Sequence, residues 1–209
     1  MKAYIKREHY ILIALNALYL VPLIIKFTLE GNYEFLAYVG QVVFLLAIIM
    51  LTIHKTRFPM WLLVMLSVWS ALHMAGGSVV VGDGVLYAYK FHHFVTLGDE
   101  GLDGYILKYD QIVHFFGFFV ATFVAYWLLL AQLKPNFRLG AIVFVAVLAG
   151  MGFGAINEII EFGAVLAAPE TGVGGYYNTA IDLVANGLGA LTAAFLILKF
   201  KIGEKATFL

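Results

Sequence analysis

Residues 139–167 read LGAIVFVAVLAGMGFGAINEIIEFGAVLA, an apolar run that Asn157, Glu158 and Glu161 interrupt in its second half. About 20 apolar residues in a helix cross the ~30 Å hydrocarbon core of a bilayer. The run is longer than that, so it predicts a membrane-spanning helix. Ionisable side chains are costly in lipid and normally face a protein interior or a water-filled cavity, where they indicate a functional site.

The composition of the whole chain agrees with a membrane environment. Of the 209 residues, 63% are hydrophobic and 12% are charged, and none is cysteine. This composition is typical of an integral membrane protein. The absence of cysteine excludes disulfides, thiolate metal sites and cysteine nucleophiles, and the net charge of zero gives no indication of nucleic acid as a partner.

Five further apolar runs have the length of a membrane span. Strands of a membrane barrel would instead show alternating runs of ~10 residues. The predicted fold is therefore all-α: a polytopic membrane protein with a six-transmembrane-helix bundle, a long extracytoplasmic loop between the third and fourth helices, and a single integral membrane domain over residues 1–209. The six spans are predicted at about residues 10–27, 35–53, 60–81, 109–133, 139–167 and 179–200.

Positively charged residues predict the orientation. If the N-terminus is cytoplasmic, 10 of the 13 lysine and arginine residues lie on the cytoplasmic side. Cytoplasmic loops carry this excess in known membrane proteins. We therefore expect a multi-pass protein of the cell inner membrane with both termini in the cytoplasm.

The polar residues of four spans fall at one depth in this topology. Alternating helices bring them all to the outer half of the bilayer, and residues three or four apart share a helix face. The set consists of His73 in the third span, Asp110 and His114 in the fourth, Asn157, Glu158 and Glu161 in the fifth, and Asp182 and Asn186 in the sixth. We expect these residues to line one cavity.

Four neighbouring carboxylates need compensation, either by protonation or by a cation. Asp, Glu and His are ligands of Mg²⁺, Mn²⁺, Fe²⁺ and Zn²⁺, and such a set also suits a two-metal centre. The expected metal ligands are Asp110, His114, Glu158, Glu161 and Asp182. Among them Glu158, Asp110 and His114 are the candidate catalytic residues, while His73, Asn157 and Asn186 are expected to form the surrounding polar network.

These residues suit three functions. The first is a metal-assisted hydrolase or transferase acting at the outer leaflet on a lipid or lipid-linked substrate. The second is a small proton- or cation-coupled transporter, which would need polar residues on both sides of the midplane. The third is a structural or lipid-binding membrane protein whose polar residues join helices at ~0.6 kcal/mol per hydrogen bond. The apolar pattern fixes no oligomeric state.

Two connecting segments are expected to cover the site. Residues 82–108 are long, acidic and aromatic, with an alternation around residues 85–95 that predicts a short hairpin or an interfacial element; His92 and His93 are expected to be interfacial there. Residues 169–177 are rich in glycine and predict a connector. Asn178 or Thr179 is expected to cap the sixth span.

Three motifs carry a resemblance to known families. They are YDQIVHFF at 109–116, NEIIEF at 157–162 and DLVANGLGA at 182–190, preceded by His73 and by Gly76 and Gly77. Over residues 60–200 the chain resembles the YjdF-type inner-membrane proteins and is more distantly similar to VanZ-like membrane proteins, whose founding member is linked to teicoplanin resistance. The resemblance implies a bacterial or archaeal cell membrane and a six-span bundle, and it brings no settled reaction.

Overall fold

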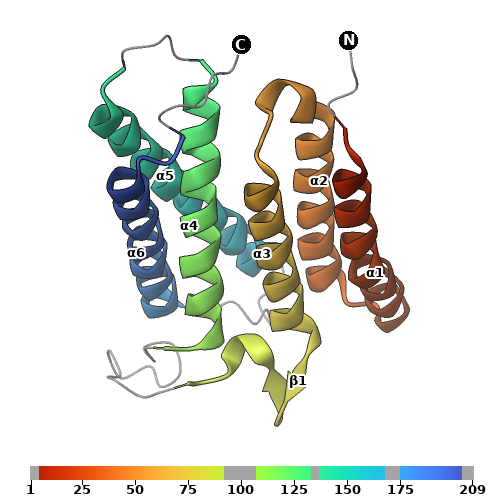
Figure 1. Cartoon of the computed structure of the whole chain (residues 1–209). Coiled ribbons are helices and arrows are strands. Elements are labelled where there is room, and N and C mark those ends of the chain that lie inside the picture. The colour runs from red at the N-terminus through yellow and green to blue at the C-terminus, as the bar shows by residue number, and fades with distance from the viewer. Residues whose placement is uncertain (1–4, 92–106, 133–136, 168–174, 204–209) are drawn as a thin grey trace. The chain divides into compact units, whose positions relative to one another are not determined.

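The computed structural model describes residues 5–91, 107–132, 137–167 and 175–203. These residues form six long helices, a two-stranded hairpin and a short 3₁₀ helix (Figure 1). In chain order they are α1 (Arg7–Glu30), α2 (Tyr33–Thr56), α3 (Met60–Ser78), β1 (Val80–Val81), β2 (Gly84–Val85), η1 (Leu86–Ala88), α4 (Tyr109–Leu130), α5 (Leu139–Ala167) and α6 (Tyr176–Phe200). The predicted all-α fold is confirmed.

All six helices are long and apolar enough to cross a membrane, with mean hydropathies from 1.4 to 2.4 over their most apolar stretches. Their bounds follow the predicted spans closely. The third helix ends at Ser78 rather than at residue 81, because the chain enters the hairpin there. The sixth helix begins at Tyr176 rather than at residue 179, after Gly175 as its N-cap.

The chain divides into two compact units, residues 1–86 and residues 87–209. The first unit contains α1, α2, α3 and the hairpin, and the second contains α4, α5 and α6. The single membrane domain over residues 1–209 stays a prediction.

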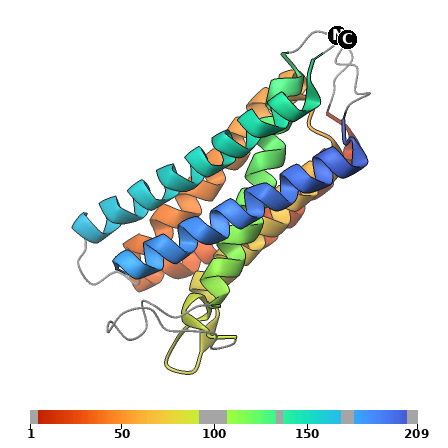
Figure 2. The same ribbon diagram turned by 90° about the vertical axis from the view of Figure 1, so that its left-hand side faces the viewer.

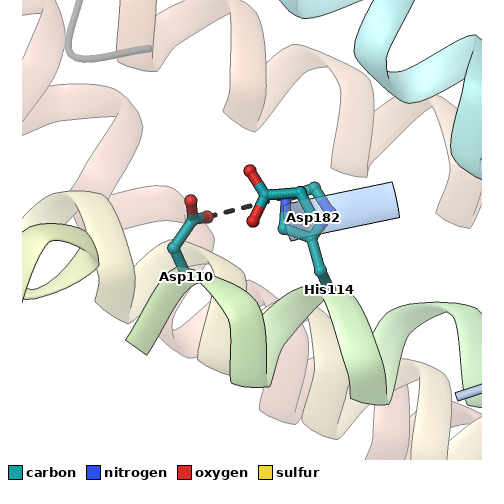
Figure 3. A group of neighbouring side chains, drawn as sticks. All are labelled: Asp110, His114 and Asp182. Atoms are coloured by element: carbon teal, nitrogen blue, oxygen red, sulfur yellow. Dashed lines mark ion pairs between the residues drawn. The ribbon is translucent and has the colours of Figure 1, made fainter. Parts of the chain in front are cut away.

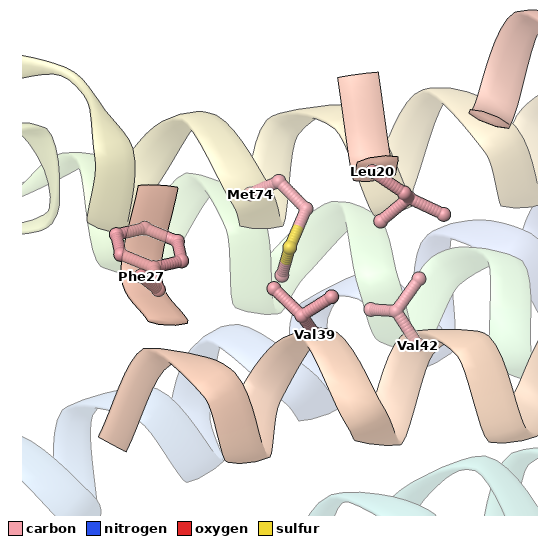
Figure 4. Close-up of a cluster of buried hydrophobic side chains, with 5 residues drawn as sticks. All are labelled: Leu20, Phe27, Val39, Val42 and Met74. Carbon is pink, nitrogen blue, oxygen red and sulfur yellow. The ribbon is translucent and has the colours of Figure 1, made fainter. Parts of the chain in front are cut away.

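The first unit has an apolar core between its three helices. Leu20 and Phe27 of α1, Val39 and Val42 of α2 and Met74 of α3 are buried together (Figure 4). Side chains of this kind contribute by close packing, which is the main force between helices in a membrane.

Polar contacts add specificity between α1 and α3. Asn16 Nδ2 donates to Ser67 Oγ at 2.8 Å. One helical turn further along each helix, Tyr19 Oη lies 2.7 Å from Ser70 Oγ. These hydrogen bonds fix the register of the two helices, as interhelical polar contacts in membranes do.

The hairpin that follows α3 lies earlier than the alternation around residues 85–95 predicted. Val80 pairs with Val85 and Val81 with Gly84 in antiparallel register. The turn contains Gly82, whose φ of 62° lies in the left-handed region that glycine adopts readily. His92 and His93 lie outside the described residues. In the second unit, an antiparallel bridge between Lys90 and Lys108 leads into α4.

Helix α4 packs against both α6 and α5 in the second unit, and its packing against α6 is the most extensive between any two described helices. The crossing of α4 and α6 depends on Gly189, where a Cβ would overlap the carbonyl oxygen of Phe115. Small residues allow such close approach of two helix backbones.

Successive helices of this unit run in opposite directions. The N-terminal ends of α4 and α6 and the C-terminal end of α5 therefore lie at the same end of the unit (Figure 2). Every polar residue predicted for spans four to six lies in the half of its helix that is nearer this end. The topology of the second unit thus brings the polar motifs of three helices together.

Candidate functional site

Helix α4 supplies the imidazole at the centre of the site. His114 is 7% exposed and lies one turn after Asp110, so both side chains leave the same helix face. The Nε2 atom of His114 lies 3.6 Å from Oδ1 of Asp110 (Figure 3).

Helix α5 brings two glutamates to the same imidazole. Oε1 of Glu158 lies 3.6 Å from Nδ1 of His114, and Oε1 of Glu161 lies 3.8 Å from Nε2. Asn157 Nδ2 donates to Oε1 of Glu161 at 2.7 Å, which holds that carboxylate in place. One ring is thus within ion-pair distance of three carboxylates from two helices.

Helix α6 supplies the fourth carboxylate and two amides. Asp182 is 0% exposed, and its Oδ2 accepts a hydrogen bond from Asn178 Nδ2 at 2.6 Å. Asn178 is itself bonded to the side-chain ammonium of Lys108, at the start of α4. Oδ1 of Asn186, one turn beyond Asp182, lies 3.1 Å from Nδ1 of His114. Through Asn178 and Asn186, α6 therefore contacts both Lys108 and His114.

Several buried polar atoms at the site have no hydrogen-bond partner among the described residues. They are both carboxylate oxygens of Glu158, Oδ1 of Asp182 and Nδ2 of Asn186. Glu158 is only 8% exposed. Burying an unpaired polar group costs about 1–3 kcal/mol, and more when it is charged. Such atoms in a native fold need an explanation, and an ion is one.

The arrangement of donor atoms fits a divalent cation. Asp110, His114 and Asp182 form one group and His114, Glu158 and Glu161 form a second, each with candidate ligand atoms within 4.8 Å of one another. Imidazole nitrogen and carboxylate oxygen are ligands of Mn²⁺, Fe²⁺ and Zn²⁺, and carboxylate oxygen suits Mg²⁺. Each group also contains an unpartnered buried oxygen, on Asp182 or on Glu158. The residues present therefore fit a metal site.

The structure brings together all five predicted metal ligands, namely Asp110, His114, Glu158, Glu161 and Asp182, with Asn157 and Asn186 beside them. His73 lies on α3 of the first unit, where its ring contacts Tyr38 and Trp69. Its place in the network stays a prediction.

Two residues of the site were not predicted as such. Asn178 or Thr179 was expected to cap the sixth span, which is wrong, because Gly175 is the N-cap of α6 and both residues lie inside the helix. Asn178 lies four residues before Asp182, as Asp182 lies four residues before Asn186. This spacing could have identified Asn178 as a site residue. Lys108 is the N-cap of α4, and no spacing in the sequence links it to Asn178 on another helix.

The chain is similar to one family of membrane proteins and to a bacterial relative. The sequence model of one family, described as a predicted membrane protein (DUF2238), matches residues 8–202. A relative from Thermotoga maritima, called an uncharacterized protein, is 31% identical over 100 residues, which are 47% of this chain and 52% of the relative. The match thus spans about half of each protein. No solved structure matches this chain.

Proposed function

The chain belongs to the DUF2238 family of predicted membrane proteins, and from this premise we propose that its second unit binds a divalent cation within the membrane. The cation serves hydrolysis or group transfer on a lipid or lipid-linked substrate. Glu158 is the observation that carries the proposal. The residue is 8% exposed, neither carboxylate oxygen has a hydrogen-bond partner in the described segments, and Nδ1 of His114 lies 3.6 Å from Oε1.

The five ligand candidates form two groups that share His114. His114, Glu158 and Glu161 would hold a cation as one group, and Asp110, His114 and Asp182 would hold one as the other. A bound divalent cation polarises a carbonyl or phosphoryl oxygen and lowers the pKa of a coordinated water. Glu158 and Asp110 are the groups proposed to accept and return protons during the reaction, whereas His114, predicted with them as catalytic, is proposed to act as a metal ligand.

The amides of the site position these ligands. Asn157 donates to Glu161, Asn178 donates to Asp182, and Asn186 faces His114. Partners that bond a ligand on its far side fix its orientation and are characteristic of metal sites. The substrate would meet a site whose donors are already oriented.

A purely structural network explains the hydrogen bonds less well. Interhelical hydrogen bonds in membranes contribute only ~0.6 kcal/mol on average. A buried carboxylate without a hydrogen-bond partner costs more than that. A network that served packing alone would therefore gain by replacing Glu158 with an apolar residue, whereas a cation site requires it.

A transport function has weaker support from the described residues. A pathway needs polar groups on both sides of the midplane. In the described part of the second unit the carboxylates lie at one end. Thr122 and Thr192, which lie further along α4 and α6, bond the backbone of their own helices instead.

The location of the site follows from the same proposal. The positive charge pattern supports cytoplasmic termini, and the polar end of the second unit would then face the outer leaflet of a bacterial or archaeal cell membrane. The finer resemblance to YjdF-type and VanZ-like proteins stays a prediction, since the family description names neither.

Equilibrium dialysis of the detergent-purified protein against Mn²⁺ and Zn²⁺ tests the proposal. Wild type should retain cation, and Glu158→Gln should weaken the affinity at least tenfold, because one charged ligand is lost. Glu8→Gln is the matched control, since Glu8 is an exposed carboxylate at the start of α1. Wild type that retains neither metal, or equal affinity in both variants, would overturn the proposal.

A further inference from the structure

The first unit contains an apolar groove of about 420 Å³ between α1, α2 and α3. Its lining runs along α1 from His9 to Ile24 and includes residues of α2 and α3. All three helices are long and apolar enough to span a membrane. The groove shares no residue with the carboxylate and histidine site, which lies on α4, α5 and α6.

The dimensions of the groove suit a chain rather than a compact molecule. Its length along α1 is about 22 Å, since His9 and Ile24 are 15 residues apart at ~1.5 Å per residue. Half of a ~30 Å hydrocarbon core is ~15 Å. The groove is longer than this, so it has room for an extended hydrocarbon chain of one leaflet. Its volume lies in the range of ~300–1,000 Å³ that is usual for ligand sites.

The groove has a buried floor and an open rim. Leu20 and Leu63 are buried in the floor, while Ile13, Val21 and Val43 are each at least 40% exposed along the rim. Ala17 of α1 and Ala47 of α2 also line the groove and are exposed. These small side chains leave the space that larger residues would fill.

Polar groups of the lining are directed to each other or to their own helix. Asn16 Nδ2 donates to both Ser67 Oγ and the carbonyl oxygen of Leu12, each at 2.8 Å. His9 Nδ1 accepts from the backbone N–H of Lys6 at 3.1 Å. The groove therefore presents hydrocarbon to an occupant, and no charged side chain lines it.

We propose that this groove binds one hydrocarbon chain of a membrane lipid, lying along α1. The family is one of membrane proteins, so the medium that reaches an open apolar rim on a spanning helix is lipid hydrocarbon. Water has few hydrogen-bonding partners there, and an unfilled groove would lose the dispersion contacts of its lining. A chain seated on Leu20 and Leu63 restores those contacts, which is the force that also packs membrane helices.

Photolabelling tests this proposal in the full-length protein. The protein is placed in nanodiscs of phosphatidylcholine that carries a diazirine in the middle of one acyl chain, and labelled residues are mapped by mass spectrometry. Labelling at Ala17 and Ala47, normalised to exposed area, should exceed labelling at Leu18 at least fivefold. Leu18 is 74% exposed on α1 and does not line the groove.

Filling the groove supplies the second readout. Ala17→Phe and, independently, Ala47→Phe should each reduce labelling of the remaining groove residues at least fivefold. Ala14→Phe, at an exposed alanine of α1 outside the lining, should leave it unchanged. Uniform labelling of all exposed residues, no labelling of Ala17 and Ala47, or equal effects of the three variants would overturn the proposal. None of these results bears on cation binding by the second unit.

Discussion

The Nδ1 atom of His114 lies 3.1 Å from the side-chain amide oxygen of Asn186. In this orientation of the Asn186 amide the oxygen faces the ring and can only accept, so the ring proton is assigned to Nδ1 and the lone pair to Nε2. Nε2 faces Asp110 and Glu161, at 3.6 and 3.8 Å. The hydrogen bond made by one ring nitrogen sets which nitrogen is free to bind a metal. Asn186 thereby prepares His114 as a ligand.

Replacing Asn186 by leucine should weaken cation binding without removing a ligand. Loss of such a supporting partner typically costs 10- to 100-fold in metal affinity, and we expect a decrease in Mn²⁺ affinity of that size. Equilibrium dialysis measures it. Thr192→Val is the control on the same helix, because Thr192 is half-buried, lies six residues beyond Asn186 and donates to Leu188 O of its own helix. Equal affinities of the two variants would contradict the positioning role.

Asn178→Ala should destabilise the protein in the absence of cation. Asp182 is 0% exposed and would lose the donor at 2.6 Å. Leaving a buried acceptor unpaired costs about 1–3 kcal/mol, and more for a charged group. Thermal unfolding followed by circular dichroism should show a lower Tm. Thr179→Ala is the control at the neighbouring residue and should change the unfolding free energy by less than about 0.5 kcal/mol. A larger loss of stability in Thr179→Ala than in Asn178→Ala would contradict the role of Asn178 as a partner of Asp182.

Gly189→Ala should disrupt the crossing of α4 and α6. The added methyl group would overlap the backbone of Phe115, which cannot rotate away as a side chain can. Overpacking costs about 1–3 kcal/mol and occasionally more. Gly187→Ala is the matched control two residues earlier, since its Cβ would meet only the end of the Met151 side chain at 3.6 Å.

The two glycine variants should therefore differ in sign. Alanine is preferred over glycine in a helix by up to about 1 kcal/mol, so Gly187→Ala should be neutral or stabilising. The Tm of both variants is measured in one detergent. Equal destabilisation would show that the α4 and α6 backbones do not approach at Gly189.

Cation should stabilise the folded protein by mass action. At a free Mn²⁺ concentration 100 times Kd, linkage predicts about 2.7 kcal/mol of additional stability. The Tm should rise with Mn²⁺ in wild type and return on addition of a chelator. The Tm of Glu158→Gln should respond much less, while Glu8→Gln should behave as wild type. A rise of equal size in Glu158→Gln would indicate that the cation binds elsewhere.

The sequence predicted the helices of this fold well because apolar length alone identifies a membrane span. It also predicted the pairing of Asp110 with His114 and of Glu158 with Glu161, since the helical period places such residues on one face. Alternating helix direction then brought the motifs of α4, α5 and α6 to one end of the second unit. These inferences need only local periodicity and the order of the spans.

The sequence did not predict which residues of different helices are in contact. Lys108 bonds Asn178 across 70 residues, and Gly189 meets the backbone of Phe115, because rotation and crossing of helices depend on side-chain packing over their whole length. The start of α6 was predicted three residues late, since the glycine-rich segment before it resembles a loop. Because of that error Asn178 was placed at the end of the helix, whereas it lies in the first turn of α6, on the same face as Asp182.

Pulsed electron paramagnetic resonance of the Mn²⁺-loaded protein tests the central claim most directly. Coordination by His114 predicts a ¹⁴N hyperfine coupling from one imidazole nitrogen, which His114→Gln should abolish while Glu8→Gln retains it. Bound Mn²⁺ without nitrogen coupling in wild type, or a coupling that persists in His114→Gln, would contradict a cation site built on His114 and its surrounding carboxylates.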